Sequence, residues 1–315
     1  MMTSWVIGAN GSLGSALVRS LQCRGAHLFE PVERFLWNDE EVLDSQLRAA
    51  VKSFVEFSSG SDNWKIYWAA GVGTMSSKEK ELATESRTIS KILELIESEP
   101  VLMSMNGGFA SSSSAGAIYA GTHDDIITEN SEVAPTTDYA KEKLKQESLI
   151  CEFANRNNKV TALLARISTL YGPGQAGGKR QGLLSHIARC LVRNQSIHIY
   201  VPFDTIRDYI TTDDAACAIV SVMDTLTGKP GVFMKIIASE HPTTIAEIIS
   251  VFKRIARRRP RIISSVSQLS SLYTRRIQFK SIAVPIEQPM LKTSLMVGAS
   301  QVMAAERTAF ARISQ

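Results

Sequence analysis

The stretch Gly8-Ala9-Asn10-Gly11-Ser12-Leu13-Gly14 decides the fold, because its evenly spaced glycines follow an apolar run and open a helical pattern. A glycine-rich turn between a strand and a helix lets backbone N–H groups approach a phosphate, and the helix dipole favours the anion. Gly8 allows a tight turn, Gly11 leaves room for a pyrophosphate, and Gly14 allows close packing of helix on strand. The turn therefore predicts a dinucleotide site with contacts from Gly8, Asn10, Gly11, Ser12, Leu13 and Gly14.

Outward from this turn, short apolar runs alternate with helical patterns, which is typical of βαβ units and a parallel sheet. Helices are predicted at about residues 13–23, 40–57, 78–98 and 137–155, and strands near residues 4–8, 26–30, 35–37, 66–69, 101–109 and 161–166. The link between the second and third of these strands is very short, whereas a parallel crossover normally needs about ten residues or more. The predicted fold class is α/β, a Rossmann-like doubly wound parallel sheet with a smaller C-terminal substrate-binding region.

The same pattern divides the chain. Residues 1–170 are predicted to form an NAD(P)-binding Rossmann domain, to which residues 205–226 return. Residues 171–204 and 227–315 are predicted to form a smaller substrate-binding domain. This second domain is expected over the carboxyl edge of the sheet, where open α/β sheets bind their ligands.

Composition excludes several classes of protein. The 315 residues are 44% hydrophobic and 21% charged, which is typical of a globular chain, and a net charge of +4 is too small to indicate a nucleic-acid partner. No apolar run approaches the roughly 18 residues that a membrane span requires. The four cysteines form no CxxC pair and the five histidines show no ligand spacing, so no disulfide framework and no metal site are expected. The first strand begins too early to leave room for a secretion signal, and we expect a cytoplasmic protein.

Tyr139 and Lys143 lie four residues apart in a helical stretch, so they project from one face about one turn apart. An ammonium beside a phenol favours the phenolate, which allows the pair to exchange a proton with an alcohol near neutral pH. The serines at 111–114 leave the end of a predicted strand and would supply a hydroxyl that holds the substrate oxygen. Tyr and Lys at this spacing are common on exposed helices, but their occurrence together with the glycine turn and the serines favours catalysis.

Further motifs follow in a fixed order. Tyr67-Trp68-Ala69-Ala70 resembles an HLAA stretch, residues 111–119 resemble a serine strand that ends in Val-Tyr-Gly, and residues 139–143 fit YxxxK. Residues 166–175 are similar to an RxxNVYGPGQ segment, and residues 207–214 to an RDYIxVxD segment. Together with the glycine turn, these motifs resemble the extended short-chain dehydrogenase/reductase family, the NAD-dependent sugar epimerase/dehydratase group. The resemblance covers most of the chain.

The resemblance implies a catalytic set of Ser114, Tyr139 and Lys143, with Ser113 as the alternative serine because one extra residue precedes Tyr119. It also implies further cofactor contacts from Ala69, Ala70, Gly71, Tyr139 and Lys143. Substrate contacts are implied for Ser114, Thr169 and Arg207, of which Arg207 would bind the substrate's diphosphate. The expected partners are a nucleotide-sugar substrate and a second copy of the chain, in a homodimer built from the helices near residues 78–98 and 137–155.

Two departures from the family pattern affect the substrate. Thr169 stands where the family has an Asn that often contacts the sugar nucleotide. Ala115-Gly116 follows the serines where dehydratases of this group carry Asp-Glu, so loss of water from the substrate is disfavoured.

A third departure affects the cofactor, NAD or NADP. The acidic residue expected after the second strand is displaced, and the family spacing lands on Val32. Glu30 or Glu33 could bind a ribose 2′-hydroxyl and favour NAD, whereas Arg34 could pair with a 2′-phosphate and favour NADP. We favour NAD slightly, because epimerases dominate the resemblance.

The predicted function is NAD(P)-dependent hydride transfer on a nucleotide-linked sugar, with a nucleotide-sugar epimerase as the first interpretation. An NADPH-dependent 4-keto-sugar reductase is the alternative. A non-catalytic NAD(P)-binding regulator is a more remote alternative, because Ser114, Tyr139 and Lys143 are all present.

Overall fold

The computed structural model describes residues 2–71, 73, 79–173, 182–264, 276–285 and 292–313. Its elements follow one another along the chain as β1 (Met2–Ile7), α1 (Ser12–Cys23), β2 (His27–Phe29), α2 (Glu40–Phe57), β3 (Asn63–Trp68), α3 (Glu79–Glu97), α4 (Pro100–Ser104), β4 (Asn106–Ser114), α5 (Ala115–Ile118), α6 (Asp138–Arg156), β5 (Val160–Ile167), β6 (Thr169–Tyr171), α7 (Leu183–Val192), β7 (Ile197–Ile199), β8 (Ile206–Thr211), α8 (Thr212–Thr225), β9 (Gly231–Ile237), β10 (Pro242–Thr244), α9 (Ile245–Ala256), β11 (Ile262–Ser264) and α10 (Leu295–Ile313).

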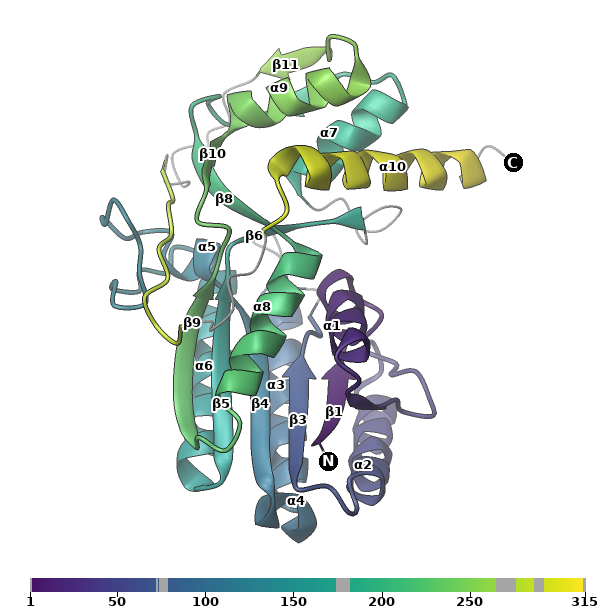
Figure 1. Ribbon diagram of the computed structural model, residues 1–315, viewed down its shortest axis with the longest axis vertical. Helices are drawn as coiled ribbons and strands as arrows, with labels where there is room; N and C mark the ends of the chain where they lie inside the picture. The colour runs from purple at the N-terminus through teal and green to yellow at the C-terminus, as the bar shows by residue number, and fades with distance from the viewer. Residues whose placement is uncertain are drawn as a thin grey trace.

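A six-stranded sheet in the order β2-β1-β3-β4-β5-β9 forms the body of the molecule, and every pair of neighbours in it is parallel. The chain starts at β1, one strand from the edge of this sheet, moves outward to the edge strand β2 and then returns through α2 to β3 on the other side of β1 (Figure 1). This reversal makes a switch point at the carboxyl ends of β1 and β3, where α/β sheets bind their ligands. The predicted fold class is confirmed.

Helices cover both faces of the sheet. Side chains of α2, α3 and α6 pack with Trp5, Ile7 and Phe109 on one face, whereas α1 and α8 pack with Val6 and Ala110 on the other. Neighbouring residues of one strand thus enter different cores, because strand side chains alternate between the two faces. The α3/α6 face carries the site described below.

A smaller body lies beyond the carboxyl ends of the strands, where α7, α9 and α10 share a core (Figure 1). Two short sheets, β10-β8-β6 and β11-β7, accompany these helices. In contrast to the predicted division of the chain, which put residues 227–315 in the smaller domain, β9 pairs with β5 at the edge of the main sheet. No helix in the described ranges is long and apolar enough to cross a membrane.

Two strand predictions were wrong in detail. Residues 35–37 form no strand, and α2 is the crossover between β2 and β3, so the short link that the sequence suggested does not exist. Phe35 and Trp37 are instead in contact with the indoles of Trp5 and Trp68, which explains an aromatic run outside a sheet.

Residues 100–104 form α4, with Pro100 in its first turn, and the strand predicted at 101–109 runs from 106 to 114.

Candidate functional site

The glycine turn packs against the end of β3. Gly8 has φ +90°, and a Cβ there would lie 2.5 Å from the Ala70 nitrogen, so only glycine fits. A Cβ on Gly14 would overlap the Gly8 carbonyl, whereas one on Gly11 would approach it to 3.2 Å. The glycines therefore bring α1, β1 and the start of the β3–α3 connection together without intervening side chains.

The amino end of α1 has the features of an anion-binding site. Its N-cap residue, Gly11, supplies no side-chain cap, and its first turn carries no acidic residue. The buried Ser12 hydroxyl has no hydrogen-bond partner within the described residues. At α2, by contrast, the Asp39 carboxylate caps the helix and two glutamates occupy the first turn. Free N–H groups and an unpartnered hydroxyl at a helix N-terminus fit a pyrophosphate.

A cleft of about 970 Å³ opens in front of this helix end. Its size suits a dinucleotide or similar ligand, since ligand sites generally measure about 300–1,000 Å³. Most of the predicted cofactor residues line it, namely Gly8, Asn10, Gly11, Glu33, Arg34, Ala69, Ala70 and Gly71. Ser12 begins α1 beside the cleft, Gly14 is buried against Gly8, and Leu13 packs toward the α1/α8 core.

The loop after β2 forms the outer wall of the cleft. Gln46 of α2 anchors it, since its side chain accepts from the Leu36 nitrogen at 2.9 Å and donates to the Arg34 carbonyl at 3.0 Å. The side chains of Glu33 and Arg34 are exposed at the mouth. The three groups that the sequence proposed for cofactor choice, Glu30, Glu33 and Arg34, therefore all line this cleft.

Tyr139 and Lys143 lie in the first two turns of α6, which the Thr137 hydroxyl caps. The Lys143 ammonium lies 5.8 Å from the centre of the Tyr139 ring. Lys143 is buried and donates to Glu85 Oε1 of α3 at 2.7 Å and to Gln146 Oε1 at 2.9 Å. Glu85 itself lines the cleft. Tyr139 and Lys143 are not themselves among the residues that line the cleft, and Glu85 links Lys143 to it.

A second buried ion pair lies one helical turn further along α6. The Glu147 carboxylate accepts from Arg166 of β5 at 2.6 and 3.0 Å, and from the Ser113 hydroxyl at 2.6 Å. The Arg166 guanidinium also donates to the Tyr119 hydroxyl. Burial raises the pKa of Tyr119, and the positive charge of Arg166 offsets only part of this effect. The network ties β4, β5, α6 and the Tyr119 segment together beneath the Tyr–Lys pair.

The serines are the last residues of β4 rather than a segment that follows it. The Ser112 hydroxyl donates to the Trp68 carbonyl at 2.8 Å, and the Ser113 hydroxyl is bonded to Glu147. Ser114 is half-buried at the N-cap position of α5 and makes no side-chain cap bond there. Ser113 is therefore committed to the scaffold, which leaves Ser114 as the stronger candidate for a substrate contact.

The predicted substrate residues lie on the strands above the main sheet. Thr169 of β6 is paired with Tyr209 of β8, and Arg207 is two residues before Tyr209, so Thr169 and Arg207 share a sheet face. Both are half-buried, and Arg207 donates to the Ile206 carbonyl at 2.8 Å. Gly174 and Gln175, which complete the RxxNVYGPGQ-like segment, lie outside the described residues.

Sequence reasoning missed two carboxylates of this region. Glu147 follows Lys143 by four residues, so helical spacing alone could have placed it on the same face. Glu85 comes from another helix, and no local pattern distinguishes it from the other charged residues of α3. Only the packing of α3 against α6 brings its carboxylate to Lys143.

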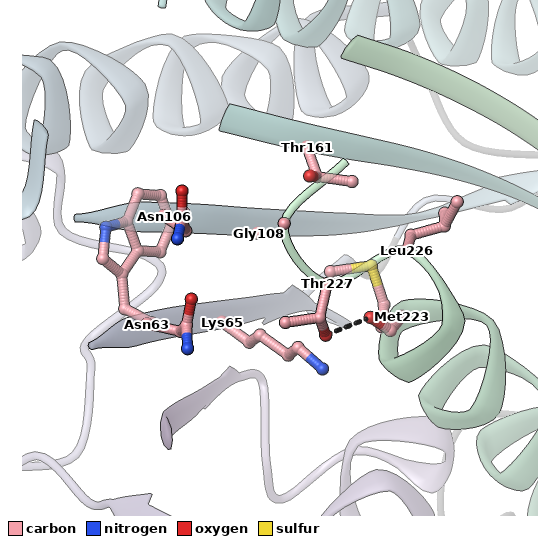
Figure 2. A pocket seen from close by; sticks show the side chains of 11 residues that line it. Asn63, Lys65, Asn106, Gly108, Thr161, Met223, Leu226 and Thr227 are labelled. Carbon is pink, nitrogen blue, oxygen red and sulfur yellow. Dashed lines mark hydrogen bonds between the residues drawn. The ribbon is translucent and has the colours of Figure 1, made fainter. Parts of the chain in front are cut away.

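A small pocket at the other end of the sheet is not part of this site (Figure 2). It is lined by residues that open β3 and β4, including Asn63 and Asn106, and by the end of α8, and its volume is about 10 Å³. That is room for about one water molecule. Among the described residues, no group of three or more His, Cys, Asp or Glu side chains could hold a metal ion.

The sequence matches the model of the NAD dependent epimerase/dehydratase family over residues 5–234. The chain belongs to this family. It is accordingly an NAD(P)-dependent enzyme of the extended short-chain dehydrogenase/reductase type, as the motifs predicted. No curated protein sequence is significantly similar to it.

Solved structures share the fold of this family member over nearly its whole length. MoeE5 in complex with UDP-glucuronic acid and NAD has a TM-score of 0.76 and 18% identity, with 98% of this chain and 99% of that one covered. RMD from Pseudomonas aeruginosa complexed with NADPH has a TM-score of 0.74, 18% identity and coverage of 98% and 99%. UDP-glucose 4-epimerase from Thermotoga maritima has a TM-score of 0.73 and 20% identity, with both chains fully covered at 100%.

Proposed function

We propose that the protein catalyses hydride transfer on a nucleotide-linked sugar, as a nucleotide-sugar epimerase. The observation that carries the proposal is that Lys143, beside Tyr139, is ion-paired with Glu85, which lines the cleft that begins at the uncapped end of α1. The similar structures with bound UDP-sugars and NAD support a nucleotide sugar as the substrate class.

The cofactor would lie along the cleft, with its pyrophosphate at Gly11, Ser12 and the free N–H groups of α1. When bound, the cofactor would supply a nicotinamide ring able to take a hydride from the sugar and to return it. Tyr139 takes the proton of the sugar hydroxyl in the first half of the reaction and gives it back in the second. Lys143 orients the phenol and stabilises its charge, and Ser114 holds the reacting oxygen.

The sugar nucleotide would extend from this point toward β6 and β8. The Arg207 guanidinium suits a diphosphate, because its planar set of donors binds phosphate oxygens in pairs. Thr169 offers a hydroxyl at the position where the family has the amide of an Asn. Because the threonine side chain is shorter, we expect it to extend less far toward the sugar nucleotide.

A 4-keto-sugar reductase is the second candidate, and one observation favours it. Arg34 is exposed at the cleft mouth on the same loop as Glu33, where it can pair with the 2′-phosphate of NADPH. A reductase uses a reduced cofactor once and then releases it, whereas an epimerase regenerates its cofactor within the site.

The distinguishing experiment starts with mass spectrometry of the purified, folded protein for retained nucleotide. Retained NAD and conversion of a nucleotide sugar without net cofactor turnover would support the epimerase. An empty site that consumes NADPH with a 4-keto-sugar nucleotide would support the reductase. Failure to bind NAD(H) or NADP(H) at all, by calorimetry, would contradict both.

We also infer a homodimer through α3 and α6, which pack side by side within one chain. Two copies of this helix pair would form a four-helix bundle, with a buried face of the kind that stable dimers use. Light scattering in dilute solution should give twice the chain mass, and a monomer mass would contradict the inference.

A further inference from the structure

Glu85 and Lys143 form a buried ion pair that crosses between two helices. Glu85 Oε1 lies 2.7 Å from Lys143 Nζ, and the two side chains are only 9% and 8% exposed. A carboxylate so far removed from water is retained only with a partner, because desolvation of a lone charge is costly. The pair is therefore a buried contact next to the cleft, which Glu85 lines, and not an incidental surface contact.

The Glu85 carboxylate is also a neighbour of the Tyr139 ring. A methyl group added at Gly73 would lie 3.3 Å from Glu85 Oε2 and 3.5 Å from Tyr139 Cε2. The carboxylate and the edge of the phenol ring therefore both border the same side of Gly73. Phenol, ammonium and carboxylate form one cluster, to which α3 contributes the acid and α6 the other two groups.

Charged groups from α3 and α6 surround Lys143. From α3, Glu85 faces Lys143, while Glu81 lines the cleft and is exposed. From α6 itself, Tyr139 and Glu147 face Lys143, but Glu147 is already paired with Arg166 of β5. Burial lowers the pKa of Lys143, and the charges of Glu85, Tyr139 and Glu147 raise it by more, so it stands above its ordinary value. Glu85 is thus the acid that directly neutralises the ammonium.

We propose that Glu85 is a positioning residue that clamps Lys143 between α3 and α6 and keeps a proton on the Tyr139–Lys143 pair. The inference deepens the proposed function and rests on it. An isolated ammonium would draw the phenol toward phenolate, whereas an ammonium with a carboxylate against it exerts a weaker net field on the phenol. A negative charge beside two neighbouring groups opposes the loss of a proton from either of them.

The expected consequence is that Tyr139 keeps, as a phenol, the proton that the reduction of a keto sugar requires. It then donates its proton to the carbonyl oxygen of a keto sugar as a hydride from the reduced nicotinamide reaches the carbonyl carbon. The C=O π electrons move to that oxygen, and the phenolate that remains takes its next proton from a sugar hydroxyl in an epimerase or from water in a reductase. This half of the reaction is common to an epimerase and a reductase.

The test compares wild type with Glu85→Gln, which removes the charge at constant size, and with Glu85→Asp, which keeps it. Glu94→Gln is the matched control, because Glu94 is exposed on the same helix and contacts Ser90 instead of the cluster. Two quantities are followed against pH: the rate of keto-sugar reduction, and the tyrosinate absorbance of each protein minus that of the same protein with Tyr139→Phe. The absorbance needs neither substrate nor cofactor.

In Glu85→Gln we expect both profiles to shift to lower pH by about one unit or more, from the loss of one nearby charge. Glu85→Asp and Glu94→Gln should stay close to wild type. If Glu85→Gln does not fold, Glu85→Asn makes the same charge change and leaves room for water beside the cleft. Calorimetry of cofactor binding shows separately that each variant keeps a competent cleft.

Unchanged profiles in a folded Glu85→Gln or Glu85→Asn protein would overturn the proposal for Glu85. If Tyr139→Phe nevertheless abolishes turnover, the proposed function stands without it. If wild type binds no cofactor and transfers no hydride, the proposed function fails, and the tyrosinate profile still decides whether Glu85 controls the proton.

Discussion

The two ion pairs on α6 are both almost fully buried, but they differ in their surroundings. Glu147 and Arg166 are 6% and 4% exposed, and their charged atoms are bonded to each other and to Ser113 and Tyr119. Lys143 and Glu85 share a single ionic contact, and Glu85 borders a cleft. A charge cluster with all its partners inside the protein holds elements together, whereas one that borders a cleft can exchange a protein partner for a ligand. The degree of burial alone therefore does not distinguish an ion pair that supports the fold from one that belongs to the functional site.

The largest effect of this difference concerns stability. Glu147→Gln removes the charge that Arg166 needs and should lower the free energy of unfolding by about 3–5 kcal/mol, because an unpaired buried cation remains. Glu85→Gln should cost less, since water or a ligand can reach Lys143 from the cleft. Urea unfolding of both variants measures the comparison. Equal losses would mean that the cleft-side pair is as much a part of the scaffold as the enclosed one.

The exposed charge of Arg34 at the cleft mouth should affect cofactor binding and not the free energy of unfolding. Arg34→Ala should weaken NADPH binding by about tenfold or more if the guanidinium pairs with the 2′-phosphate, a charge-assisted bond worth roughly 1.5–3 kcal/mol. NADH binding and urea unfolding should hardly change. Calorimetry with both cofactors tests this, and equal losses for the two would show that Arg34 only shapes its loop.

The sequence was most informative where one local rule acts. The glycine turn, the capped helices α2 and α6, and the Tyr139–Lys143 spacing could all be recognised from the order of residues, because each depends on neighbours in the chain. The aromatic run at 35–37 misled, because strand-like composition there serves packing against Trp5 and Trp68. Local propensity yields to tertiary contact in such places.

Contacts between residues that are far apart in the chain could not be predicted, because no local rule links such residues. Glu85 reaches Lys143 across 58 positions of chain, and Ser113 reaches Glu147 across 34. The serine motif alone therefore left Ser113 and Ser114 as close alternatives, whereas the packed structure shows that Ser113 already has a partner. Which polar residue is free for a substrate is a property of the folded network.

The most direct test of the account is transfer of an isotope-labelled hydride between cofactor and a panel of nucleotide sugars, by wild type and Tyr139→Phe. Tyr139→Phe removes only a hydroxyl, so folding and cofactor binding should persist through the glycine turn and Lys143. Since a positioned acid–base group contributes about 10²–10⁴-fold, we expect wild type to transfer the label and the variant to transfer it at least about 100-fold more slowly. An active wild type together with a Tyr139→Phe variant that keeps most of that activity would contradict the assignment of α6 as the proton-transfer helix.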